Sequence, residues 1–92
     1  MTAISADIIP FAKTMRVEII EASADRVVGK LLVRPDLCTT GGTLHGGAVM
    51  ALADSLGAIG AYLALPQGAA GTTTLESKTN FIGAAKGGST VI

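Results

Sequence analysis

Two features near the middle of this chain could do chemistry: one carboxylate, and a glycine-rich segment directly before it. The carboxylate is Asp54, which lies inside a run of apolar and small residues that predicts a helix. A carboxylate on a half-buried apolar helix face costs several kcal/mol unless it is paired or hydrogen-bonded. Asp54 is therefore either a functional carboxylate or a solvated position on an exposed face, and helical spacing leaves both readings open.

The glycine-rich segment spans residues 41–47 and runs straight into the predicted helix. It consists of Gly41, Gly42, Thr43, Leu44, His45, Gly46 and Gly47. Glycines at a helix start leave the free backbone N–H groups unobstructed, and those donors suit an anion or a developing oxyanion. The alternative is a flexible loop whose glycines only supply unusual φ/ψ angles. A phosphate-binding loop is not predicted, because no Gly-Lys-Ser/Thr sequence follows.

Spacing separates the two features within one chain. Gly46 and Asp54 are eight residues apart, which places them roughly 12 Å apart along a helix axis. One small carbonyl group cannot touch both. If the two act together, they come from two chains that meet across a symmetry axis, so catalysis predicts a homodimer or a larger assembly.

The hydrophobic pattern predicts a sheet packed on one long helix. A short helix or turn is expected at 8–13. Two strands are expected at 15–20 and 26–34, joined by a turn at 21–25. Further strands are expected at 72–82 and from 89 onward. The helix is expected to run from Gly46 or Gly47 to Leu65, and Pro66 ends it. These elements predict an α+β fold.

Helical projection divides the predicted helix into two faces. The face expected against the sheet carries Leu52, Leu56, Ile59 and Leu63. The opposite face carries Met50, Ala51, Asp54, Gly57, Ala58 and Ala61. Small residues let another backbone approach closely, so this second face is predicted to be covered by another chain.

Composition excludes several classes of function. The chain has 92 residues, 49% of them hydrophobic and 15% charged, with zero net charge. It is therefore one domain at most and is not disordered, and nucleic acid is not an expected partner. One cysteine and one histidine form neither a disulfide framework nor a zinc site, so no metal or cofactor is expected and the lone thiol favours a reducing compartment.

A membrane location is not predicted either. The apolar window 44–65 is long enough to span a bilayer, but Asp54 at its middle disfavours insertion. Residues 1–7 lack the basic region of a secretory signal. The expected location is the cytoplasm.

At these residues the sequence resembles the hotdog-fold acyl-CoA thioesterases of the phenylacetic-acid degradation and 4-hydroxybenzoyl-CoA thioesterase type. The matching motifs lie at 42–48, 51–55, 73–81 and 86–88. The resemblance implies a curved antiparallel sheet wrapped around one long central helix, in units that pair into homodimers or homotetramers. Because the family domain continues beyond Ile92, it also implies that residues 1–92 form a single, partial domain.

The resemblance assigns roles to individual residues. It implies that Asp54 is the nucleophile or the general base, and that the N–H of Gly46, from the opposing subunit, polarises the thioester carbonyl. His45 matches the histidine that shapes the turn and contacts the carbonyl or the sulfur. Thr74, or Thr73 after a one-residue slip, matches the hydroxyl that holds the water or the acid.

The remaining expectations concern the substrate. Acyl-CoA with an aromatic or medium-chain acyl group is the implied substrate, and its contacts are predicted at Thr39, Gly47, Met50, Ser55 and Thr73. Thr39 stands where many members have Asn or Gln, and 83–84 replace a common Arg-Pro pair that contacts CoA phosphates. Two alternatives stay open: a non-catalytic acyl-CoA-binding module, and an inactive truncated fragment.

Overall fold

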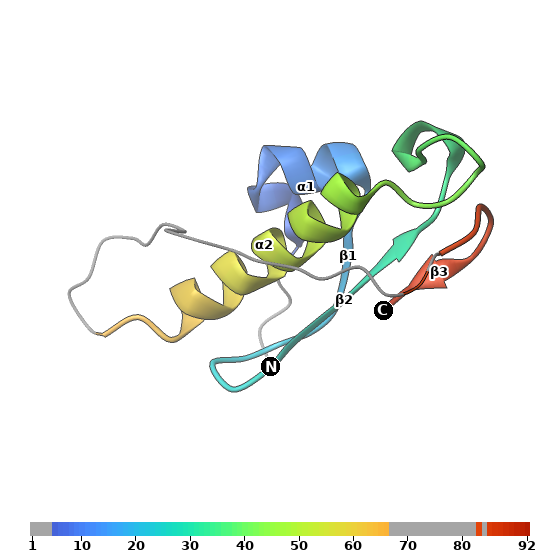
Figure 1. The fold of residues 1–92 in the computed structure, drawn as a ribbon. Coiled ribbons are helices and arrows are strands. Elements are labelled where there is room, and N and C mark those ends of the chain that lie inside the picture. Colours follow the sequence, from blue (N-terminus) through green and yellow to red (C-terminus); the bar gives the residue numbers. More distant parts are fainter. Residues whose placement is uncertain (1–4, 67–82, 84) are drawn as a thin grey trace.

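One long helix, α2 (Gly46–Leu63), packs across an antiparallel sheet. The computed structural model describes residues 5–66, 83 and 85–92 (Figure 1). The other elements are η1 (Ala6–Ile8), α1 (Pro10–Met15), β1 (Glu18–Ala22), β2 (Val27–Leu32), η2 (Pro35–Leu37) and β3 (Thr90–Val91). The strands follow the order β1-β2-β3, and both pairings are antiparallel. The predicted α+β class is confirmed.

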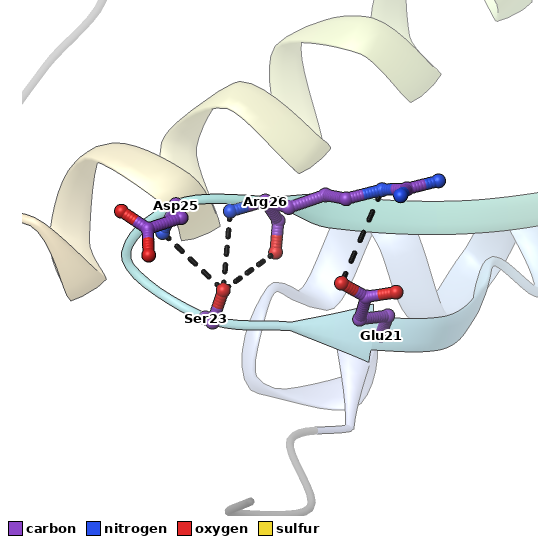
Figure 2. A network of polar contacts seen from close by, with 4 residues as sticks. All are labelled: Glu21, Ser23, Asp25 and Arg26. Atoms are coloured by element: carbon purple, nitrogen blue, oxygen red, sulfur yellow. Dashed lines mark hydrogen bonds and ion pairs between the residues drawn. The ribbon is translucent and has the colours of Figure 1, made fainter.

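The first two strands form the predicted hairpin. Ser23 closes its turn, because its Oγ accepts hydrogen bonds from the backbone N–H groups of Asp25 (3.3 Å) and Arg26 (3.1 Å). Figure 2 shows this turn, together with the ion pair between Glu21 of β1 and Arg26, the residue before β2, whose charged atoms lie 4.0 Å apart. A serine that satisfies the backbone in this way favours a turn over continued strand.

The first strand begins later than the alternation of apolar residues predicts. Met15, expected in a strand, is the last residue of α1, and β1 begins at Glu18. Arg16 between them takes a left-handed conformation with φ of 60°. The N–H of Val17 then bonds back to the carbonyl of Ala12 at 3.1 Å. This bond closes the helix end in the manner of a left-handed C-cap, which alternation does not reveal.

The second strand ends earlier than predicted. β2 ends at Leu32, whereas the predicted strand runs to residue 34, and the side chain of Arg34 is only 12% exposed. The chain turns into η2 at Pro35, and the Arg34 guanidinium instead donates to the carbonyl of Thr14 at 2.7 Å. It also pairs with the carboxylate of Asp36. Arg34 therefore ties α1 to the segment after the sheet.

The helix lies on β2 in a defined register. A Cβ at Gly29 of β2 would lie 2.7 Å from the Cδ2 of Leu56, and a Cβ at Gly60 would lie 3.4 Å from Val27. Four helix residues rise about 6 Å, and two strand residues about 6.6 Å, so successive contacts match when α2 runs antiparallel to β2. At Gly29 the side chain of Leu56 occupies the space that a Cβ would need.

The predicted sheet-facing side of the helix is found in the structure, whereas Ala51, predicted on the opposite face, is half-buried and packs against the core. Leu52 and Ile59 are buried, and Leu56 and Leu63 are half-buried. The core under α2 also contains residues of α1, the strands and the segment before the helix: Ala12, Met15, Val17, Leu31, Val33 and Leu44. Helix α1 lies beside the N-terminal half of α2 (Figure 1).

The C-terminal residues extend the sheet as predicted. β3 pairs with β2 through Leu31 with Val91 and Leu32 with Thr90. The predicted strand at 72–82 lies outside the described residues. By length and composition α2 could cross a membrane, but one such helix is weak support because core helices pass the same test.

Candidate functional site

The segment before α2 is a small hairpin rather than an open loop. Cys38 and Leu44 form an isolated antiparallel bridge, and the N–H of Thr39 donates to the carbonyl of Thr43 at 2.8 Å. Gly41 and Gly42 at its tip have φ of 88° and 74°, values that side chains rarely adopt. These two glycines are therefore required by the turn itself.

The C-terminal segment holds this hairpin in place. The N–H of Leu44 donates to the carbonyl of Ala85 at 2.7 Å, and the N–H of Gly87 donates to the carbonyl of Gly42 at 2.8 Å. On the other side, the N–H of His45 donates to the carbonyl of Leu37 at 2.9 Å. The entry to α2 is thus fixed by segments that lie before and after the helix in the chain.

The first four backbone N–H groups of α2 differ in their hydrogen-bond acceptors. The N–H of Gly47 donates to the Nδ1 of His45 at 2.8 Å. Those of Ala48 and Val49 both donate to the His45 carbonyl, at 2.9 and 3.3 Å. The N–H of Gly46 has no acceptor among the described residues. Within the part of the chain that the structure describes, this one donor at the positive end of the helix dipole is therefore open to a ligand oxygen.

His45 is the N-cap of α2. Because Nδ1 accepts the bond from Gly47, the neutral imidazole carries its proton on Nε2. The side chain is exposed. A Cβ at Gly47 would lie 2.9 Å from the same Nδ1, so the imidazole can sit over the first turn only because residue 47 lacks a side chain.

Asp54 lies two turns further along the same helix, on the face away from the sheet. It is exposed, as are Ala53, Gly57 and Ala61. Its separation from Gly46 along the axis is about 12 Å by helix geometry. The structure therefore keeps the open donor and the carboxylate apart within one chain. The helix face around Asp54 consists of small residues, and the described part of the chain leaves it exposed.

The other predicted site residues are distributed around these two positions. Met50 is half-buried on α2, and Thr39 is exposed in the small hairpin. Ser55 is 6% exposed and belongs to the buried side of α2, so the structure does not bring it together with Asp54's open face. Thr73 and Thr74 lie outside the described residues.

Sequence reasoning missed a cavity beside the start of α2. It has a volume of about 370 Å³ and is lined by α1, by the segment around η2 and by the first turn of α2. Its residues come from three separate stretches of the chain, and no local pattern links them. Among the described residues, no three His, Cys, Asp or Glu side chains gather in a way that could hold a metal ion.

Comparison with known protein families matches residues 41–92 to the thioesterase superfamily. The match begins in the small hairpin, includes all of α2 and covers more than half of the chain. Comparisons with curated proteins and with solved structures found no similar protein. With its long helix packed on an antiparallel sheet, the chain belongs to the thioesterase superfamily, and its fold is the hotdog.

Proposed function

We propose that this chain is one subunit of an acyl-CoA thioesterase of the phenylacetic-acid degradation and 4-hydroxybenzoyl-CoA thioesterase type. The observation that carries the proposal is the N–H of Gly46, the only first-turn donor of α2 with no acceptor among the described residues. A donor in this position stabilises the negative charge that develops on a thioester oxygen. Superfamily membership supports the reaction class.

Asp54 supplies the second group of the proposed site, from a second copy of the chain. Its carboxylate either attacks the thioester carbon or takes a proton from the water that does. Both routes break the carbon–sulfur bond and release CoA as its thiol, and both leave the acyl group as a carboxylic acid. In the first route, water then hydrolyses the mixed anhydride formed on Asp54.

The exposed face of α2 supports the two-copy site. Outside the backbone of the helix itself, no atom of the described residues lies within 4 Å of where a Cβ at Gly57 would be, and Ala53 and Ala61 beside it are exposed. Two such faces can approach closely across a twofold axis. Because Gly46 and Asp54 lie about 12 Å apart on each helix, antiparallel pairing would bring the donor of one copy toward the carboxylate of the other.

Removal of the single donor tests the proposal. Gly46 is the first residue of α2, where proline is favoured and its missing N–H costs no helical bond. His45 before it has φ of −61° and ψ of 135°, which a following proline accepts. We expect Gly46→Pro to lower kcat for phenylacetyl-CoA roughly 100- to 1000-fold, while Gly46→Ala, which keeps the N–H, retains most activity.

Co-expression tests whether the site is shared. Gly46→Pro and Asp54→Asn should each be inactive alone, and a mixed dimer should contain one intact site. Random pairing of the two variants then restores about a quarter of the wild-type activity. No recovery in mixed dimers would show that both groups act within one chain.

A folded oligomer that binds acyl-CoA without hydrolysing it would instead identify a binding module. Acyl-CoA hydrolysis that persists at wild-type rate in Asp54→Asn would remove Asp54 from the mechanism. Thiol release from phenylacetyl-CoA and octanoyl-CoA, measured on the same samples as their assembly state, distinguishes these outcomes.

A further inference from the structure

One charged side chain is buried close to the entry of α2. The side chain of Arg34 is only 12% exposed, and its Nε is buried with no hydrogen-bond partner among the described residues. Burial of a charged group costs free energy, and an apolar residue of similar size in its place is often neutral or stabilising. The arginine is therefore better explained by the geometry that it imposes than by a gain in stability.

The guanidinium of Arg34 joins two elements that are separate in the chain. Its Nη2 donates to the carbonyl of Thr14 at 2.7 Å, and its Nη1 pairs with the carboxylate of Asp36. Thr14 lies in the last turn of α1, and the last carbonyl groups of a helix lack donors within the helix. Asp36 lies in η2. The planar fork of a guanidinium can bind both partners at once, whereas a lysine offers a single nitrogen.

Helix α1 provides a fixed position for this contact. Ala12 and Met15, which are 0% and 2% exposed, belong to the core under α2. Buried side chains of this kind are held by close packing and move little. A group that is bonded to the carbonyl of Thr14 is therefore held relative to the core.

The short helix η2 connects Arg34 to the start of α2. The N–H of Leu37 donates to the carbonyl of Arg34 at 2.9 Å, and the carbonyl of Leu37 accepts the N–H of His45, also at 2.9 Å. His45 is the N-cap and directly precedes Gly46. A displacement of η2 would therefore move the backbone on one side of Gly46.

We propose that Arg34 is a positioning residue, which holds η2 on α1 and thereby fixes the Gly46 N–H in the direction of the thioester oxygen. The inference rests on the proposed function, in which that N–H stabilises the developing negative charge. A displacement of about 1 Å in a group that acts on the reacting atoms can cost about 100-fold in rate. Loss of the guanidinium fork should consequently lower the rate in a chain that remains folded.

Amide hydrogen exchange at His45 tests the positioning without any substrate. Its N–H bonds to the carbonyl of Leu37, so its exchange rate, measured by NMR, reports how often this contact opens. Arg34→Met replaces the buried charge by an apolar side chain, and water can solvate Asp36, whose side chain is 68% exposed. We expect exchange at His45 to become about tenfold faster while the urea midpoint stays close to that of the wild type.

Kinetics in two backgrounds test the connection to the donor. Arg34→Met should lower kcat for phenylacetyl-CoA about tenfold and change KM less than about twofold, because the affected interaction forms in the transition state. In Gly46→Pro, which lacks the donor, the same substitution should cause no further loss of kcat. An equal loss in both backgrounds is the result of a merely structural role and would overturn the proposal.

Two further variants complete the test. Arg26→Met is the matched control, because Arg26 also forms an ion pair but is 69% exposed beside the turn of the sheet hairpin. It should change neither exchange at His45 nor kcat. Arg34→Lys keeps the charge but not the fork, so exchange at His45 should be faster here too. Wild-type exchange in either Arg34 variant would overturn the proposal, so a poorly folding Arg34→Met leaves the test intact.

The exchange measurement also separates this proposal from the proposed function. Faster exchange at His45 in the Arg34 variants of a chain that hydrolyses no acyl-CoA would support the positioning and refute the hydrolysis. Hydrolysis by the wild type with unchanged exchange in the variants would do the reverse.

Discussion

At the scale of single residues, His45 connects the small hairpin to the helix. Its N–H bonds to the carbonyl of Leu37, its carbonyl accepts from the first turn, and its Nδ1 accepts from Gly47. These four hydrogen bonds fix the backbone on both sides of Gly46. The histidine thus helps to fix the start of the helix at the candidate site, whether or not it contacts a substrate.

The hydrogen bond from the Gly47 N–H to the His45 Nδ1 can be removed by a side-chain substitution at residue 45. We expect His45→Ala to lower the free energy of unfolding by about 1 kcal/mol, because the N–H of Gly47 loses its acceptor. Asn at the same position retains an acceptor of suitable reach, so His45→Asn should unfold close to the wild-type urea midpoint. Equal destabilisation by both substitutions would show that the imidazole acts through packing instead.

Gly47 can be tested in combination with this cap. A methyl group at residue 47 would lie 2.9 Å from the His45 Nδ1 and displace the imidazole. Gly47→Ala should therefore be neutral or destabilising in the wild type. In the His45→Ala background the clash is gone, and the same substitution should stabilise by about 0.5–1 kcal/mol through helix propensity. Additive effects in this double-mutant cycle would contradict the contact.

At the scale of elements, the close approach of α2 to β2 depends on Gly29. A Cβ there would lie 2.7 Å from the Cδ2 of Leu56 and 3.3 Å from the carbonyl oxygen of Glu18. We expect Gly29→Ala to lower the free energy of unfolding by about 1–3 kcal/mol, because extra volume in a packed contact forces side chains from their rotamers. Urea denaturation measures the change.

A second substitution separates this contact from strand propensity. Shortening the helix side chain in Leu56→Ala makes room for the new methyl group. Gly29→Ala should then cost less in the Leu56→Ala background than in the wild type, with a coupling of about 1 kcal/mol. The same cost in both backgrounds would show that the helix does not press on this strand position.

At the scale of the whole molecule, the face of α2 that the described residues leave uncovered is the proposed contact between copies of the chain. Gly57 lies at the centre of this face, with open space around it in the described chain. A charge buried without a partner opposes association, so Gly57→Glu should weaken the dimer about 100-fold or more. Sedimentation across a concentration series measures the dissociation constant.

The outer surface of the sheet offers the matched control. Ile20 is an exposed apolar residue on β1 and is not part of the proposed interface face of α2. Ile20→Glu should leave the dimer intact, while a loss of tetramers in this variant would assign the sheet face to a second contact. Dimers that survive in Gly57→Glu would refute the α2 interface.

The sequence by itself determined the features that depend on neighbouring residues. The two faces of α2 follow from a period of 3.6 residues, and Leu52 and Ile59 are buried as that period predicts. The hairpin follows from alternation and turn residues. The separation of Gly46 and Asp54 follows from helical rise, so the order of residues alone predicts that a site using both is shared between two copies.

Only the tertiary structure decided the features that depend on contacts between distant segments. The predicted strand extends to Arg34, yet the guanidinium of this residue donates to the carbonyl of Thr14, twenty residues earlier. The end of α1 at Met15 depends on a left-handed cap that has no glycine to mark it. The cavity joins three stretches of chain. None of these follows from local periodicity, because the energy that fixes each one arises only when the segments pack together.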